Sequence, residues 1–250
     1  MFRPRIIPVL LLSQKALYKT VQFENPKYVG DPLNAVKLLS EFEADELVLL
    51  DIDRSENVNL ELLQKISNET MMPFSYGGNI DSFEKAVKVF NHGAEKIIIN
   101  SKLYENYNII SEIANVYGNQ AIIASIDVRK IDNNYVLFSE SGKKQESISL
   151  KEHIENCDKN GAGEILINSI DQDGTRKGYD LELIKMASSY TNLPVIACGG
   201  AHKEEDLMAA INLSNASAAC AGSFFIYVGV NNAVLINYPD PEELLEMFNK

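Results

Sequence analysis

The chain has 250 residues, of which 46% are hydrophobic and 23% are charged. That composition is typical of a folded globular protein and excludes an intrinsically disordered chain. The formal net charge of −12 argues against nucleic acid as a partner, because the phosphate backbone attracts basic surfaces.

The sequence shows neither a membrane anchor nor a disulfide framework. The apolar run at 6–12 is too short to span a membrane, and no small-residue cleavage site follows it. The three cysteines, Cys157, Cys198 and Cys220, have no C-x-x-C spacing. We therefore expect reduced, buried thiols in a cytoplasmic protein, with no metal site, no cofactor and no membrane association.

Apolar runs that predict buried strands alternate along the whole chain with amphipathic stretches that predict helices. In chain order, the predicted strands cover 6–12, 47–52, 73–77, 96–100, 121–128, 165–170, 194–198 and 217–221. The predicted helices cover 31–42, 59–67, 82–91, 105–116, 150–160, 180–189, 203–212 and 241–249. This alternation predicts an α/β fold, a single (β/α)8 TIM barrel over residues 1–250. Residues 135–139 predict a small hairpin inserted after the fifth strand.

Internal repeats divide this barrel into two similar halves. Residues 46–53 match 164–171, the glycine pair at 77–78 matches the pair at 199–200, and Ser101 matches Ser223. The order of the matches predicts two fused half-barrels of four βα units each, about 1–120 and 121–250.

The repeated glycines and serines predict two phosphate-binding sites. Ligands of such barrels bind at the C-terminal ends of the strands. Gly78 and Gly200 follow the third and seventh strands, Asn100 and Ser101 follow the fourth, and Ser223 follows the eighth. Glycine lets backbone N–H groups approach an anion, and serine can donate to a phosphate oxygen. One glycine pair could simply form a tight turn, but the duplication favours a ligand with a phosphate at each end.

Carboxylates also gather at the predicted strand ends. Asp51 and Asp53 follow the second strand, Asp127 ends the fifth, and Asp171 and Asp173 follow the sixth. A carboxylate there can act as a general acid or base if its neighbours tune its pKa, or it can cap a helix or pair with a cation. We take Asp127 and Asp173 as candidate catalytic residues, Asp127 first because it ends a buried run.

The symmetry also exposes an absence. Superposing the first strand on the fifth places Leu11 at the position of Asp127. Because leucine cannot transfer a proton, chemistry that needs two opposed carboxylates at these positions is not expected here.

A second pattern lies at the opposite, N-terminal end of the barrel. Arg5, Glu46, Lys96 and Glu164 stand at the start of the first, second, fourth and sixth strands. They would ring the bottom opening with two positive and two negative side chains. From the spacing alone, solvated or paired surface charges explain them at least as well as a functional ring.

The whole chain resembles the cyclase subunit of imidazole glycerol phosphate synthase. The resemblance covers about residues 1–240 and is carried by the segments at 5–7, 30–32, 45–51, 76–78, 125–127, 161–165, 169–174 and 197–200. In that family a glutaminase subunit docks at the bottom of the barrel. The ammonia that it releases passes a charged gate and crosses the barrel to a bisphosphorylated substrate at the top.

The resemblance implies a role for each matching residue. Asp127 matches one of the family's two catalytic aspartates. Lys19 matches a lysine of the flexible first loop, and we take it as a third candidate catalytic residue. The ammonia gate of the family matches Arg5, Glu46, Lys96 and Glu164. Its phosphate-binding positions match Gly78, Asn100, Ser101, Gly174, Gly200 and Ser223.

The chain departs from the family pattern at three places. Leu11 stands where the family has its other catalytic aspartate, residues 13–16 lack the Asp-Gly turn of the first loop, and the tail at 233–239 differs. These departures are similar to a cyclase-like branch encoded with bacterial surface-polysaccharide and flagellar-glycan genes. That resemblance implies work with a glutaminase-like partner and a sugar amidotransferase, which converts an acetamido group on a sugar to an acetamidino group.

Two main hypotheses for the function follow. The first is an ammonia-conducting subunit of a glutamine amidotransferase that serves acetamidino-sugar formation for surface glycans. The second is a histidine-pathway cyclase that makes imidazole glycerol phosphate. Leu11 opposes the second, because loss of a general acid or base costs roughly 10²–10⁴-fold in rate. A non-enzymatic scaffold would bind neither a phosphorylated ligand nor a glutaminase, and we expect the first hypothesis.

Overall fold

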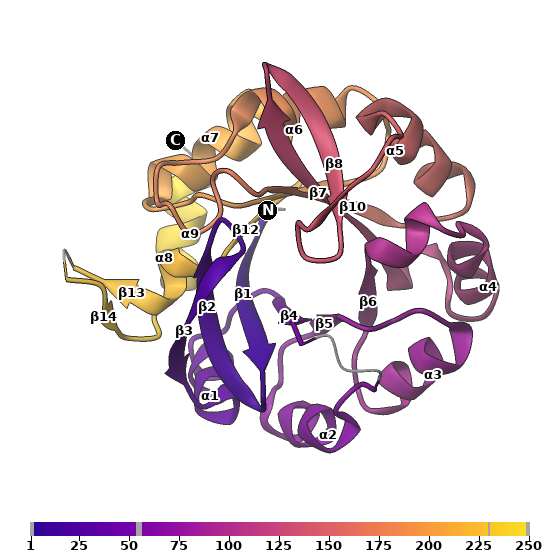
Figure 1. The fold of residues 1–250 in the computed structure, drawn as a ribbon. Helices are drawn as coiled ribbons and strands as arrows, with labels where there is room; N and C mark the ends of the chain where they lie inside the picture. Colours follow the sequence, from indigo (N-terminus) through magenta and orange to yellow (C-terminus); the bar gives the residue numbers. More distant parts are fainter. Residues whose placement is uncertain (1–2, 54–56, 230, 249–250) are drawn as a thin grey trace.

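The computed structural model describes residues 3–53, 57–229 and 231–248. Eight parallel strands close into a barrel in the order β10-β11-β12-β1-β4-β5-β6-β7, and β7 pairs back to β10 (Figure 1). The strands are β1 (Arg5–Ser13), β4 (Leu47–Asp51), β5 (Phe74–Gly77), β6 (Lys96–Ile99), β7 (Ile122–Ile131), β10 (Glu164–Ser169), β11 (Val195–Cys198) and β12 (Ala218–Ala221). They are rich in Val, Ile and Leu because both of their faces are covered. The predicted TIM barrel is confirmed.

Helices form a ring around the barrel and cover the outer face of its strands (Figure 1). They are α1 (Pro32–Glu41), α2 (Leu60–Glu69), α3 (Phe83–Asn91), α4 (Asn108–Tyr117), α5 (Leu150–Lys159), α6 (Leu181–Ser188), α7 (Glu204–Ser214), α8 (Ser223–Ile226) and α9 (Pro241–Phe248), with 3-10 turns η1 (Ser101–Tyr104) and η2 (Asn119–Ala121). Side chains cap the N-termini of five of them, which fixes where each begins: Asp31, Asn59, Ser82, Ser149 and Asp180. The helix after the fourth barrel strand begins at Asn108 and not at residue 105, because η1 precedes it.

Alternate residues of the strands fill the barrel interior. On β1, Ile7, Val9 and Leu11 share one buried cluster, whereas Ile6 and Leu10 belong to the larger core under the helices. Every buried member of the interior cluster lies on a barrel strand: Ile7, Val9, Leu11, Val48, Ile98, Ile123, Leu166, Ile196, Cys198, Ala218 and Cys220. The period of two in a strand thus separates the interior from the layer between strands and helices.

Two hairpins extend the barrel at the C-terminal ends of opposite strands. The expected one is present: β7 continues to Ile131 and pairs with β8 (Asn134–Ser139), which pairs with β9 (Lys144–Gln145). A second hairpin, β2 (Ala16–Val21) with β3 (Glu24–Gly30), follows β1 and was not predicted. Its first turn places Gln14 and Lys15 at positive φ, where glycine or asparagine is usual, so the sequence carries no hairpin signal there.

The C-terminal tail forms a separate small hairpin before it returns to the barrel. Strands β13 (Tyr227–Val228) and β14 (Ala233–Val234) pair with each other and project from the barrel wall (Figure 1). Farther along, the Tyr238 hydroxyl donates to the Ile6 carbonyl oxygen over 2.8 Å, which ties the tail to the start of β1. Among the described residues, none of the helices has the length and apolar character needed to cross a membrane.

Candidate functional site

The bottom opening of the barrel is closed by a ring of four ion pairs. Arg5 contacts Glu46 over 2.5 Å and also pairs with Glu164. Lys96 reaches the same two carboxylates, at 3.1 Å from Glu46 and 2.7 Å from Glu164. Ser75 donates a further hydrogen bond to Glu46 over 2.8 Å. The four residues that the sequence predicted as a ring therefore lie together, with positive and negative charges in alternation.

The carboxylates of this ring are buried beside their cationic partners. Glu46 is 3% exposed and Glu164 is 7% exposed. Burial raises the pKa of Glu164, but hydrogen bonds and charge from Arg5 and Lys96 outweigh it, so the pKa lies below its ordinary value. Because desolvating such charges is expensive, an apolar plug would close this opening at lower cost. The ring is thus a specific feature of the opening and not a requirement of the fold.

At the top of the barrel, β1 and β7 present different groups to each other. Three strands separate them on either side of the closed sheet, so they lie opposite one another. Leu11 is 8% exposed and belongs to the interior cluster. Asp127 is also 8% exposed, and it continues the inward-facing positions of Ile123 and Ser125 along β7. One side of the mouth therefore carries an acid, and the facing side carries a hydrocarbon.

Asp127 lies in surroundings that favour its protonated form. Asn100 Nδ2 donates to Asp127 Oδ2 over 2.7 Å. Burial raises the pKa of Asp127 to about 7; hydrogen bonds from Asn168 and Asn100 oppose the rise, and the charge of Asp173 adds to it. A carboxyl group with this pKa can both accept and donate a proton near neutral pH. Asn168 was missed from the sequence, although a polar residue at an inward position of β10, two after Leu166, is a readable signal.

The unpredicted β2–β3 hairpin carries Lys19 to the barrel mouth. Lys19 is 5% exposed, and its ammonium group has no hydrogen bond or ion pair with the part of the chain that the structure describes. A Cβ atom built on Gly222 would lie 2.2 Å from Lys19 Nζ, so glycine is needed for the ammonium group to lie there. The neighbouring Thr20 hydroxyl donates to Asp173 over 3.1 Å, and Gln22 N donates to the Asp173 carbonyl oxygen over 2.9 Å. The hairpin is thus fastened to the loop after β10.

Lys19 joins the residues predicted as the second phosphate site. Gly174, Gly200 and Ser223 follow the neighbouring strands β10, β11 and β12, and therefore meet at one edge of the barrel. Gly200 has a φ of +111°, and a Cβ there would lie 2.1 Å from the Gly178 carbonyl oxygen. A lysine ammonium group beside glycine backbone of positive φ is an arrangement compatible with an anionic ligand.

The residues predicted as the first phosphate site lie at the ends of β5 and β6. Gly78 has a φ of +116°, and a Cβ on it would lie 2.4 Å from the Asp51 carbonyl oxygen. Ser101 opens the turn η1 directly after Asn100, and its Oγ accepts a hydrogen bond from Glu140 N over 2.9 Å. The hairpin after β7 therefore reaches this site, as the hairpin after β1 reaches the other.

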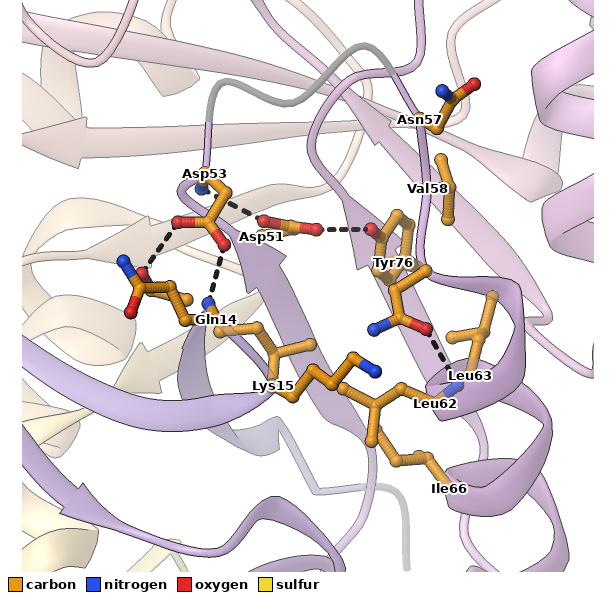
Figure 2. Close-up of a pocket in the computed structure, with 13 residues that line it drawn as sticks. Gln14, Lys15, Asp51, Asp53, Asn57, Val58, Leu62, Leu63, Ile66 and Tyr76 are labelled. Atoms are coloured by element: carbon orange, nitrogen blue, oxygen red, sulfur yellow. Dashed lines mark hydrogen bonds between the residues drawn. The ribbon is translucent and has the colours of Figure 1, made fainter.

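A cavity of about 360 Å³ lies beside the mouth, between the β1–β2 turn, the end of β4 and helix α2 (Figure 2). Tyr76 donates to Asp51 over 3.1 Å, and Asp53 accepts hydrogen bonds of 2.6 Å from Ser13 Oγ and Gln14 N. Burial raises the pKa of Asp51. Asp53 holds the β1–β2 turn in place, and Asp51 accepts a hydrogen bond of 2.9 Å from Asp53 N, which favours a structural role for both. Asp127 and Lys19 do not line this cavity.

His153 lies on α5, among the helices that surround the barrel. His153 is fully buried between Tyr104 and Tyr107, stacked on the first and hydrogen-bonded to the second over 2.6 Å. Burial lowers its pKa to about 4. In the described ranges, no group of three or more His, Cys, Asp or Glu side chains is arranged to hold a metal ion.

Comparison with known proteins gives a consistent set of relatives. Residues 5–231 match the model of a family described as histidine biosynthesis protein. A protein of Pseudomonas aeruginosa provisionally named imidazole glycerol phosphate synthase subunit hisF2 is 44% identical over 248 residues, which cover 98% of this chain and 99% of the relative. The provisionally named subunit hisF3 of Vibrio vulnificus is 42% identical over 97% of this chain and 95% of its own. Imidazole glycerol phosphate synthase subunit HisF of Thermotoga sp. (strain RQ2) is 39% identical over 95% of both chains.

Proposed function

We propose a function for this chain on the basis of its family. It belongs to the histidine biosynthesis protein family and is related to the cyclase subunit HisF of imidazole glycerol phosphate synthase. It acts as the barrel subunit of a glutamine amidotransferase. Ammonia from a glutaminase partner enters at the bottom ring, crosses the barrel and leaves at the mouth, where a phosphorylated ligand binds. The chain has given up efficient cyclase chemistry.

The observation that carries this proposal is the charged ring at the bottom. Arg5, Glu46, Lys96 and Glu164 are fully paired with one another, and both carboxylates are buried. A ring of alternating charges can open by exchanging partners, whereas an apolar plug of the same size cannot admit a polar molecule. A TIM barrel needs no such ring for stability, because its interior is normally a packed core.

An apolar rim beside the ring supports docking of a partner there. Met71, between α2 and β5, is 96% exposed, and Phe42 at the end of α1 is 39% exposed. The Met71 N–H donates to Ser40 Oγ over 3.0 Å, which holds the two segments side by side. Both belong to the end of the barrel where the strands begin, the same end as Arg5 and Lys96. Exposed large apolar side chains at one opening favour a protein partner at that opening.

The docking test is co-purification with a glutaminase subunit from the same source. We expect a complex at micromolar concentrations and a rise in glutamine hydrolysis by the glutaminase when the barrel is added. Met71→Glu should weaken the complex by at least tenfold, because it places a charge in an apolar interface. Leu235→Glu, at an exposed position of the C-terminal tail, is the matched control and should leave binding unchanged. Failure of the wild-type chain to bind or stimulate the glutaminase would contradict the proposal.

A cyclase that makes imidazole glycerol phosphate is the second candidate, and Asp127 favours it. Its pKa of about 7 suits a general acid or base. The decisive assay supplies free ammonia at high pH with the bisphosphate substrate of the imidazole pathway, so that no glutaminase is needed. Turnover within about tenfold of an ordinary cyclase would establish the second candidate, since removing one proton-transfer group costs roughly 10²–10⁴-fold.

The same assay on Leu11→Asp tests whether the missing acid is what limits the cyclase reaction. We expect the rate to rise by about 10²–10⁴-fold, because the variant places a carboxylate across the barrel from Asp127. Leu11→Asn has similar size and polarity but cannot transfer a proton, and it should stay at the wild-type level. Equal rates for the two variants would show that more than the acid has been lost.

The acceptor that we propose for the ammonia is an acetamido sugar of a surface glycan, amidated by a separate sugar amidotransferase. The support is the resemblance of the first strand, the first loop and the tail at 233–239 to the glycan-associated branch. Formation of an acetamidino sugar from glutamine by the three proteins together, and not by any two, is the expected result.

A further inference from the structure

Two of the three cysteines are neighbours across the barrel wall, and no role described above uses them. Strands β11 and β12 run parallel in a register that pairs Ile196 with Ala218 and Ala197 with Ala219. The next step of that register places Cys198 opposite Cys220. Both side chains belong to the interior cluster, so they point to the same side of the sheet.

The spacing of the strands suits a covalent bond between the two thiols. Neighbouring strands lie about 4.7–4.9 Å apart, and a disulfide requires a Cα–Cα distance of about 4.4–6.8 Å. Cys198 and Cys220 meet this requirement through the register of β11 with β12, and both belong to the interior cluster. Both are free thiols in this structure, and so is Cys157, which lies alone in α5. The barrel therefore holds one thiol pair and one isolated, equally buried thiol.

The pair is accessible from one side only. Cys198 ends β11 at the mouth and is 7% exposed, whereas Cys220 is fully buried. Burial raises the pKa of the Cys220 thiol, as does the neighbouring Cys198 side chain, while the positive charge of Lys19 acts in the opposite direction. Cys198 is thus the thiol that a small oxidant meets first, and Cys220 is placed to react second.

We propose that Cys198 and Cys220 are a modification site, at which a hydroperoxide converts the two thiols to a reversible intramolecular disulfide. The Cys198 thiolate attacks hydrogen peroxide, the O–O bond breaks, and a sulfenic acid and hydroxide are formed. The Cys220 thiolate then attacks the Cys198 sulfur, the S–O bond breaks, and the S–S bond forms with release of a second hydroxide. The two thiol protons neutralise the two hydroxides, so two thiols and one peroxide give one disulfide and two waters.

The bond would connect the two strands that lead into the second proposed phosphate site. Gly200 follows Cys198 by two residues, and Gly222 and Ser223 follow Cys220 by two and three residues. Disulfide formation itself does not depend on the proposed function, because it requires only the pairing of β11 with β12 and access from the mouth.

The test uses the full-length chain treated with a small excess of hydrogen peroxide under native conditions. After denaturation and alkylation of the remaining thiols, trypsin places Cys198 in the peptide 186–203, Cys220 in 204–250 and Cys157 in 152–159. We expect peptides 186–203 and 204–250 to be joined, with loss of two hydrogen atoms in mass, and Cys157 to be alkylated. Dithiothreitol added before alkylation should separate them.

Cysteine variants supply the controls. Cys157→Ser should form the same linked pair as the wild-type chain, whereas Cys198→Ser and Cys198→Ala should not form it. Recovery of three alkylated cysteines after peroxide treatment would overturn the proposal. So would a linkage through Cys157, or a disulfide found only between two copies of the chain.

Discussion

The two openings of this barrel treat charge in opposite ways. At the bottom, Arg5 and Lys96 each contact both Glu46 and Glu164, so every charge of the ring has two partners. At the mouth, Asp127 and Lys19 have buried side chains and no ion-pair partner of opposite charge among the described residues. Asp127 has amide partners and a raised pKa, and Lys19 has no ion pair within the described ranges.

This difference separates an opening whose charges are neutralised by one another from an opening whose charges are not. A fully paired ring is at a free-energy minimum and must be disturbed to open, which suits a gate. Unpaired buried charge costs stability and is retained where a ligand supplies the missing partner. Because both openings share the same strands, the difference lies in which residues begin and end each strand.

Removing a cation from the bottom ring should have the largest effect. Arg5→Met leaves two buried carboxylates that share only Lys96. We expect the free energy of unfolding in urea to fall by about 3–5 kcal/mol at pH 7, the usual cost of breaking a buried ion pair.

Lys65→Met is the control, because Lys65 forms an exposed pair with Glu61 on α2. Because water screens such an exposed pair, it contributes little to stability. If Arg5→Met costs no more than this control, the ring is not the compensated structure described here.

A smaller effect is expected from the acid at the mouth. Folding raises the pKa of Asp127 to about 7, so between pH 4 and pH 7 the folded state holds a proton that the unfolded chain releases. The free energy of unfolding should therefore fall as pH rises from 5 to 8, by about 2–3 kcal/mol from this group.

Urea unfolding of Asp127→Asn at several pH values checks this, because the variant should lose that part of the pH dependence. Asp132→Asn, at an exposed position in the β7–β8 turn, should keep it. Identical slopes for wild type and Asp127→Asn would show that this carboxyl group does not titrate as expected.

The smallest effect concerns the ammonium group at the mouth. If Lys19 awaits an anion, Lys19→Met should weaken the binding of inorganic phosphate about tenfold, or roughly 1.4 kcal/mol, as measured by titration calorimetry. Lys27 lies opposite Lys19 in the register of β2 with β3, but its side chain is exposed. The Lys27→Met variant should therefore bind phosphate like the wild type. An unchanged affinity in Lys19→Met would place the phosphate elsewhere.

The barrel strands and the bottom ring could be predicted because their signals are local. A buried parallel strand reads as a run of Val, Ile and Leu, and the residue that begins such a run must lie at the bottom opening. The order of the strands in the barrel then brings Arg5 to Glu46 and to Glu164, although Arg5 and Glu164 are 159 residues apart along the chain.

The first hairpin and the residues that it positions could not be predicted in the same way. Gln14 and Lys15 adopt positive φ without glycine or asparagine, because Asp53 holds the turn by accepting hydrogen bonds from Gln14 N and Ser13 Oγ. That support comes from another strand, and it cannot be seen in the turn itself. The approach of Lys19 to Gly222 depends on this hairpin.

The sequence by itself determined the barrel, the charges at its lower end and the presence of Leu11 where a second acid is expected. Each follows from the period of buried residues along one strand. Only the tertiary structure decided that the ring is closed, that Asp127 carries a raised pKa, that Lys19 lies unpaired over Gly222, and that Cys198 meets Cys220. Those properties depend on distances between side chains of different strands and on exclusion of water, and both arise only when the sheet closes.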